Sequence, residues 1–188
     1  MSSSDRNEDN LGPTGSSMIS DHGDEAKDEA IGAPEEISEA ELNRLGLAVW
    51  NAAKDGNLDR LRAAERQGGS LGWENVDGST PLKIASLYNR IGVVNYLLTR
   101  DVDLNTVSTR GMSALHYAAL FGNTEIAVAL LEAGIDYTIV YRDDIDRYPW
   151  RRFGKTAQQF AESHDNVDTT AAIIGFIADH VAGAVEDV

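Results

Sequence analysis

The sequence predicts an all-α solenoid of stacked helix pairs, preceded by an acidic segment that stays outside the fold. Three observations support this prediction: related residues recur every 33 positions, helix-start signals accompany each recurrence, and the composition changes after residue 37. Repeats of about 20 to 50 residues are typical of solenoids, in which each unit packs only against its neighbours.

The composition fits one folded region and excludes several classes of protein. The chain has 188 residues, with 31 acidic and 16 basic side chains and a formal charge of −15. It contains no cysteine, which excludes disulfide scaffolds, thiolate metal sites and cysteine nucleophiles. The negative charge argues against nucleic acid and membrane surfaces as partners, because both need clustered Lys and Arg. No apolar run approaches the ~18 residues of a membrane span, so we expect a soluble protein of the cytoplasm and/or nucleus.

Residues 1–37 have the composition of a disordered acidic tail. They contain ten Asp and Glu residues against Arg6 and Lys27, and no aromatic residue. Such a segment cannot bury enough apolar surface to offset its ordering entropy. We therefore expect the folded region at 38–182, followed by a short C-terminal tail at 183–188.

The first helix pair has a clear start. Ser38 and Glu41 form a Ser-x-x-Glu capping box ahead of apolar residues at helical spacing, such as Leu45 and Val49. Asp55-Gly56-Asn57 interrupts this pattern, and a short second helix follows as far as Gly68. This unit has no turn motif of its own, so we expect it to cap the N-terminal end of the solenoid.

The 33-residue period is most visible in three aligned segments. They read Gly-Ser-Thr-Pro-Leu-Lys-Ile-Ala at 78–85, Gly-Met-Ser-Ala-Leu-His-Tyr-Ala at 111–118 and Gly-Lys-Thr-Ala-Gln-Gln-Phe-Ala at 154–161. The third begins 43 residues after the second, so about ten residues are inserted. The pattern resembles the ankyrin repeat over roughly residues 39–180. The resemblance implies four units at 38–70, 71–104, 105–137 and 151–182, β-hairpin fingers between them, and an insertion at 138–150 that extends one finger.

The chemistry of each unit agrees with this alignment. Gly78 and Gly111 suit a turn position with positive φ. Pro81 suits the first helical position, where its missing N–H costs nothing. The hydroxyls of three residues are placed to cap the first helices: Thr80, Ser113 and Thr156.

Two departures from the family pattern are visible. In ankyrin repeats a His after the Thr-Pro-Leu segment bonds the capping hydroxyl; His116 keeps this place, whereas Lys83 and Gln159 occupy it elsewhere. The second helices are expected to end near Asp101 and Gly134 in left-handed conformations. The second helix of the last unit, at 169–174, looks weakened and suggests a C-terminal cap.

No catalytic or metal-binding set is present in the sequence. The four histidines are scattered, and no P-loop, Gly-x-Ser-x-Gly or His-Glu-x-x-His motif occurs. Asp143, Asp144 and Asp146 suggest a calcium loop, but its glycine and closing Glu are missing. We expect no enzymatic activity, no cofactor and no metal.

The resemblance implies a concave groove formed by the finger tips and the ends of the first helices, where partners of ankyrin proteins bind. Leu87-Tyr88 and Leu120-Phe121 lie 33 residues apart and would be neighbours along it. The two leucines either bind or pack into the helix layer, whereas exposed aromatic residues in line favour binding. The predicted groove contacts are Asp77, Leu87, Tyr88, Arg110, Met112, Leu120 and Phe121.

The inserted segment is the second predicted contact region. Residues 137–153 hold five aromatic residues and four arginines, types that are enriched at interface hot spots. The alternation of Tyr137, Ile139 and Tyr141 predicts a strand and hence an extended β-hairpin. Alternatively, Tyr148 and Trp150 cover the junction between unequal repeats. The candidate contacts are Tyr141, Arg142, Arg147, Tyr148, Trp150, Arg152 and Phe153.

Two further tryptophans are expected to be structural: Trp50 in the core, and Trp73 as a shield over the first unit. The alternative for Trp73 is that it extends the edge of the groove.

The function we predict is a non-catalytic adaptor or inhibitor, monomeric in isolation, that holds one protein partner. The alternative is an acidic chaperone or carrier for a basic client such as a ribosomal protein or histone. The charge of −8 on residues 1–37 motivates the alternative, since it would steer and neutralise such a client. The other interpretation of this segment is that its charge only keeps the protein in solution.

Overall fold

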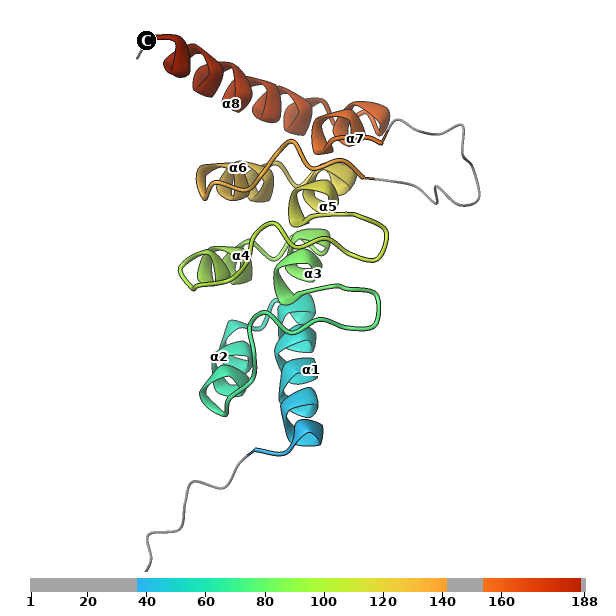
Figure 1. Cartoon of the computed structure of the whole chain (residues 1–188), viewed down its shortest axis with the longest axis vertical. Coiled ribbons are helices and arrows are strands. Elements are labelled where there is room, and N and C mark those ends of the chain that lie inside the picture. The colour runs from blue at the N-terminus through green and yellow to red at the C-terminus, as the bar shows by residue number, and fades with distance from the viewer. Residues whose placement is uncertain (1–36, 142–153, 187–188) are drawn as a thin grey trace, which may run out of the picture. The chain divides into compact units, whose positions relative to one another are not determined.

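The computed structural model describes residues 37–141 and 154–186, with side chains up to His180 (Figure 1). This part of the chain is helical and contains no β-strand, which confirms the all-helical class. Its helices are α1 (Glu39–Asp55), α2 (Leu58–Arg66), α3 (Pro81–Leu87), α4 (Ile91–Leu98), α5 (Ala114–Phe121), α6 (Thr124–Glu132), α7 (Ala157–Ser163) and α8 (Val167–Glu186).

The helices form four pairs that stack in chain order. We call α1, α3, α5 and α7 the inner helices and α2, α4, α6 and α8 the outer helices; each contacts its counterpart in the next pair (Figure 1). Four alanines at the repeat spacing are at most 1% exposed: Ala52, Ala85, Ala118 and Ala161. Their small side chains let the inner helices approach closely, and the core lies between the inner and outer layers.

The predicted helix starts are confirmed. Thr80 Oγ1 accepts from Lys83 N at 3.3 Å, and Thr156 Oγ1 accepts from Gln159 N at 3.4 Å. Ser113 forms a reciprocal capping box with His116, and Pro81 occupies the first turn of α3. Each cap satisfies amides at a helix start that would otherwise have no partner.

A series of left-handed residues connects inner to outer helices, and the sequence reasoning missed most of it. Gly56, Asn89, Gly122 and Asp165 have φ of 75°, 56°, 68° and 57°, and they share one place in the repeat. A Cβ at Gly122 would lie 2.7 Å from Asn166 Oδ1, so this position needs glycine for space as well as for φ. The spacing of these four residues, 33, 33 and 43 positions, was the available signal.

The predicted left-handed position at Asp101 is wrong. Helix α4 ends at Leu98 with Thr99 as a right-handed cap, and Asp101 has no positive φ. Gly134 does have a positive φ, of 85°, as predicted. The left-handed conformation costs more free energy for aspartate than for glycine, and helix α4 ends without a left-handed residue.

The fingers between helix pairs are tight loops in the described residues rather than strand pairs. In the first, Gly78 N donates to Asn75 O at 2.9 Å and φ of Gly78 is 67°. In the second, Gly111 N donates to Ser108 O at 2.7 Å and φ of Gly111 is 76°. Thr109 N donates to Asp77 O at 2.9 Å, which connects the two loops.

The strand predicted over Tyr137–Tyr141 is absent. Residues 137 and 138 form a turn, in which Asp136 Oδ1 accepts from Thr138 N at 2.8 Å. Tyr141 makes a single antiparallel bridge with Lys155. Residues 142–153 lie outside the described part of the chain, so the extended finger stays a prediction.

The last outer helix is much longer than expected. We predicted a weakened helix at 169–174 and a tail from 183, whereas α8 extends from Val167 to Glu186. Proline is absent from this segment and alanine is frequent, so nothing in it strongly opposes the helix.

Side chains at one repeat position connect neighbouring units. Arg90 Nε donates to Lys54 O at 2.9 Å, Asn123 Nδ2 to Ser86 O at 2.7 Å, and Asn166 Nδ2 to Ala119 O at 2.8 Å. Each bond supplies a side-chain donor to a carbonyl in the last turn of the preceding inner helix, where intrahelical donors run out. The 33- and 43-residue spacing of these three donors could have identified them.

Asn123→Ala is expected to lower the free energy of unfolding by about 2 kcal/mol, because it leaves partly buried carbonyls unsatisfied between two units. Denaturant titration followed by circular dichroism measures the change. Asn95→Ala, an exposed change on α4, is the control and should alter stability by less than about 0.5 kcal/mol. Equal stability of the two variants would contradict the role of Asn123.

Candidate protein-binding site

The ends of the inner helices form a surface that we call the inner-helix surface, comprising Lys54, Leu87, Tyr88, Leu120 and Phe121. Tyr88 is 43% exposed and Phe121 is 56% exposed. Leu87 and Leu120 are half-buried and pack against the core. Of the two roles considered for these leucines from the sequence, this is packing into the helix layer. The structure therefore places two exposed aromatic rings at the same position of adjacent repeats.

Lys54 orders the edge of this surface. Its Nζ lies 5.5 Å from the ring centroid of Tyr88 and 5.8 Å from that of Trp50. A cation near two aromatic faces restrains all three side chains. Sequence reasoning missed Lys54, although it lies 33 residues before Leu87.

The loop tips supply exposed charges but not every predicted contact. Asp77 and Arg110 are exposed, and Arg110 lines an open pocket of about 580 Å³ together with Val107 and Val140. Met112 is 6% exposed and belongs to the core, so it offers a partner almost no surface. We leave Met112 out of the site for this reason.

The structure describes the insertion only at its N-terminal end, as far as Tyr141. Tyr141 is half-buried and packs edge-on against Phe160, with ring centroids 5.1 Å apart. The other predicted contacts of this segment lie outside the described residues: Arg142, Arg147, Tyr148, Trp150, Arg152 and Phe153. Their role in binding stays a prediction.

Trp50 and Trp73 have structural contacts. A Cβ at Gly46 would lie 2.1 Å from the Trp73 ring, and Trp73 Nε1 donates to Asn43 Oδ1 at 3.3 Å. Trp73 therefore covers α1, as predicted. Trp50 is half-buried rather than central to the core, and its Nε1 donates to Ser79 Oγ at 3.4 Å.

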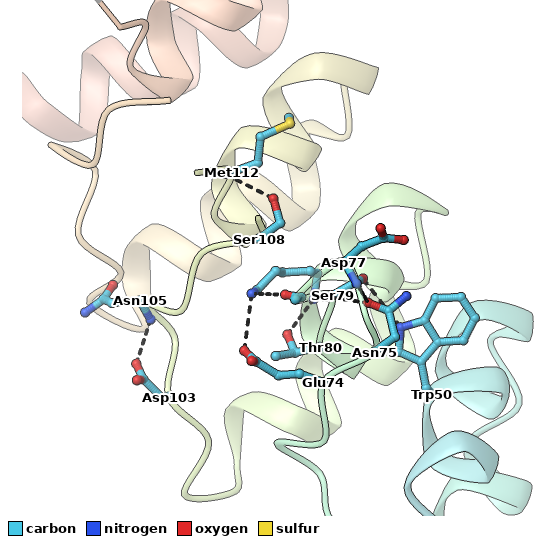
Figure 2. Close-up of polar contacts among 12 residues, drawn as sticks. Trp50, Glu74, Asn75, Asp77, Ser79, Thr80, Asp103, Asn105, Ser108 and Met112 are labelled. Atoms are coloured by element: carbon cyan, nitrogen blue, oxygen red, sulfur yellow. Dashed lines mark hydrogen bonds and ion pairs between the residues drawn. The ribbon is translucent and has the colours of Figure 1, made fainter. Parts of the chain in front are cut away.

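Trp50 belongs to a repeat position that we call the loop-anchor position, which also includes Lys83, His116 and Gln159. The Lys83 side chain is 1% exposed, and its Nζ donates to Gly78 O at 2.6 Å. Glu74 Oε1 lies 3.7 Å from the same Nζ (Figure 2). Burial lowers the pKa of Lys83, and the carboxylate of Glu74 partly opposes this shift.

His116 is a structural histidine. Its Nδ1 accepts from Ser113 N at 3.3 Å and lies 2.8 Å from Ser113 Oγ, while Nε2 lies 3.1 Å from Lys155 O. Burial lowers the pKa of His116 below its ordinary value. Both ring nitrogens are engaged, so His116 joins its own helix cap to the loop of the next unit.

Features of some other functions are absent from the described residues. These residues contain no cluster of three or more His, Asp or Glu side chains placed to hold a metal ion. Among the helices of the same region, none combines the length and hydropathy that crossing a membrane requires.

Comparison with known proteins agrees with the repeat geometry. The family model for ankyrin repeats (three copies) matches residues 48–141, which is half of the chain. The chain is 35% identical over 91 residues to ankyrin repeat and SOCS box protein 3 of Bos taurus. It is 30% identical over 104 residues to the RelA-associated inhibitor of Mus musculus. It is also 30% identical over 133 residues to probable E3 ubiquitin-protein ligase XBOS34 of Oryza sativa subsp. japonica.

These matches cover 47%, 55% and 69% of this chain, but only 17%, 12% and 24% of the relatives' lengths. The similarity therefore concerns the repeats and not the whole of those proteins. Ankyrin repeats are generally non-catalytic modules for protein interaction. With the helix pairs, the caps and the match in agreement, the chain belongs to the ankyrin repeat family.

Proposed function

We propose that this protein is a non-catalytic adaptor or inhibitor that holds one protein partner on the inner-helix surface. The observation that carries the proposal is the exposure of Tyr88 and Phe121, 43% and 56%, at equivalent places in adjacent repeats. Neighbouring exposed aromatic side chains on a folded scaffold are typical anchors of protein interfaces.

The scaffold favours binding because its anchors are already positioned. Tyr88 contacts Lys54, and Phe121 ends a helix whose C-cap is the left-handed Gly122. Little ordering entropy then opposes association. The relative named RelA-associated inhibitor supports the inhibitory form of the proposal.

The test is quantitative affinity capture from native extract with the full chain as bait. Tyr88→Ala/Phe121→Ala is expected to lower recovery of the main stoichiometric partner by about a hundredfold, the loss of two hot-spot side chains. Ile37→Ala/Leu42→Ala, which removes comparably exposed apolar side chains from elsewhere, is the control and should retain the partner. Full recovery with the first variant, folded by circular dichroism, would exclude this surface.

A second candidate function is an acidic chaperone or carrier for a basic client, favoured by the charge of −8 on residues 1–37. Replacing the ten acidic residues of this segment by Asn and Gln keeps its length and removes the electrostatic field of its negative charges. For a purified core histone as probe, we expect the association rate at low salt to fall about tenfold. A rate that is unchanged and insensitive to salt would exclude this candidate.

A further inference from the structure

Helix α8 has apolar side chains on two faces. One face packs on the stack, where Thr169 and Ile173 are each 1% exposed. On the opposite face Val167 is 73% exposed and Ile174 is 45% exposed. Ala171 and Ala178 are also exposed. We call Val167, Ala171, Ile174 and Ala178 the α8 outer face.

The spacing of the α8 outer face is that of a helix-pairing seam. Its four residues are separated by four, three and four positions, and the sequence continues this spacing at 181 and 185 with valines. Alternating steps of four and three residues keep one apolar line facing a second helix. Small and β-branched residues along such a line allow close approach of that helix.

A groove begins at the start of this face. It has a volume of about 340 Å³ and is lined by Val167, Thr170, Ala171 and Ile174, with Glu162 and Asp165 among the polar residues at its edge. Thr170 Oγ1 is buried and has no hydrogen-bond partner within the described residues. The walls of this groove include the apolar side chains of Val167, Ala171 and Ile174, which an incoming apolar side chain can contact.

The charge around this face has one sign. Residues 156–188 contain six Asp and Glu residues and neither Lys nor Arg. Glu162, Asp165, Asp168 and Asp179 are exposed on α7, α8 and the turn between them. A second copy of the chain would bring like charges together, whereas a basic partner would gain attraction.

We propose that the α8 outer face binds an amphipathic helix of another protein whose apolar side is flanked by Lys and Arg. The helix lies along the seam, with its apolar side chains over Ala171 and Ile174 and its basic side chains near Asp165 and Asp168. This interaction is separate from the inner-helix surface, because none of its residues belongs to that surface.

The probe for the test is a labelled synthetic helix of Leu and Lys with Leu at the seam spacing, titrated with the full chain by fluorescence anisotropy. Ala171→Glu is expected to raise the Kd about tenfold or more, because it buries a charge under the peptide. The added negative charge would by itself attract this peptide, so weaker binding reports the apolar seam. Ala48→Glu makes the same change on an exposed face of α1 and should change the Kd by less than about twofold.

Charge is tested separately. Asp165→Asn/Asp168→Asn is expected to raise the Kd about threefold and to reduce its dependence on salt. A matched peptide with Glu in place of every Lys should bind at least about tenfold more weakly than the Lys peptide. Tyr88→Ala/Phe121→Ala should leave the peptide affinity unchanged, which separates this proposal from the proposed function.

Three results would overturn the proposal. The first is equal affinity of Ala171→Glu and the unaltered chain, with both folded by circular dichroism. The second is equal binding of the Glu and Lys peptides. The third is a dimer in sedimentation equilibrium that Ala171→Glu dissociates, since the occupant would then be a second copy.

Discussion

Lys83→Ala is expected to lower the free energy of unfolding by about 3 kcal/mol, a large effect for a lysine. The Lys83 side chain is 1% exposed, so truncation leaves a cavity of the kind that costs about 2 to 5 kcal/mol when Met or Leu becomes Ala. It also removes the donor to Gly78 O, the carbonyl of the residue at the turn of the first loop. Denaturant titration at neutral pH measures the loss.

Lys83→Met separates the packing of the stem from the hydrogen bond of the ammonium group. The variant keeps the volume but loses the bond to Gly78 O and the ion pair with Glu74, so we expect a cost of about 1 kcal/mol. Lys83→His introduces the residue found at this position in the next repeat and should be intermediate. Equal destabilisation by Lys83→Met and Lys83→Ala would show that the ammonium bond dominates, contrary to this prediction.

The stability difference between the unaltered chain and Lys83→Met should also depend on pH. Burial lowers the pKa of Lys83 in the folded state, so above that pKa the unfolded chain binds more protons than the folded chain. Raising the pH through this window towards the ordinary lysine pKa therefore favours the unaltered chain. A difference that is constant with pH would contradict the assignment.

The sequence was informative wherever one residue type serves one backbone geometry. Thr80 and Thr156 could be recognised as caps because a hydroxyl before a helix has few other uses. Gly78 and Gly111 could be recognised because positive φ strongly favours glycine. The period of 33 then placed the helix pairs relative to one another without further information.

The sequence was less informative where a residue acts through its neighbours. Nothing in the chain near Lys83 shows that the loop carbonyl of Gly78 would receive a buried ammonium group. The length of α8 was underestimated because its second apolar face has no partner that the repeat pattern implies. Asp101 was assigned a left-handed conformation by alignment with Gly134, although alignment cannot transfer a glycine's freedom to aspartate.

In the candidate site too, some residues could be predicted from the repeat spacing and others depended on their neighbours in the fold. The exposure of Tyr88 and Phe121 followed from repeat spacing, because equivalent positions share an environment in a solenoid. Met112 lies near a loop tip in sequence, yet its side chain turns into the core. Lys54 was overlooked because the first unit lacks the turn motif that defines the register of the others.

His116→Ala is expected to lower the free energy of unfolding by about 3 kcal/mol at neutral pH. The ring is 1% exposed, bonds Ser113 and lies near Lys155 O, so its removal leaves a cavity and an incomplete helix cap. His116→Gln should cost only about 1 kcal/mol, because Gln159 Oε1 accepts from Thr156 N at 3.0 Å in the same role. Comparing the two variants by denaturant titration separates the contribution of the helix cap to stability from the contribution of the buried ring.

The His116→Gln variant also isolates the titration of one buried group. Burial lowers the pKa of His116 in the folded state, and Nδ1 accepts from Ser113 N only while it is unprotonated. As the pH falls below the ordinary histidine pKa, the unfolded chain binds the proton first, so stability falls until the folded-state pKa is reached. The unaltered chain should therefore lose more stability than His116→Gln between neutral and mildly acidic pH, since the other titrating groups are common to both. Parallel stability curves for the two proteins would mean that the folded state protonates His116 without cost, and the bond from Ser113 N to Nδ1 would then contribute nothing to the cap.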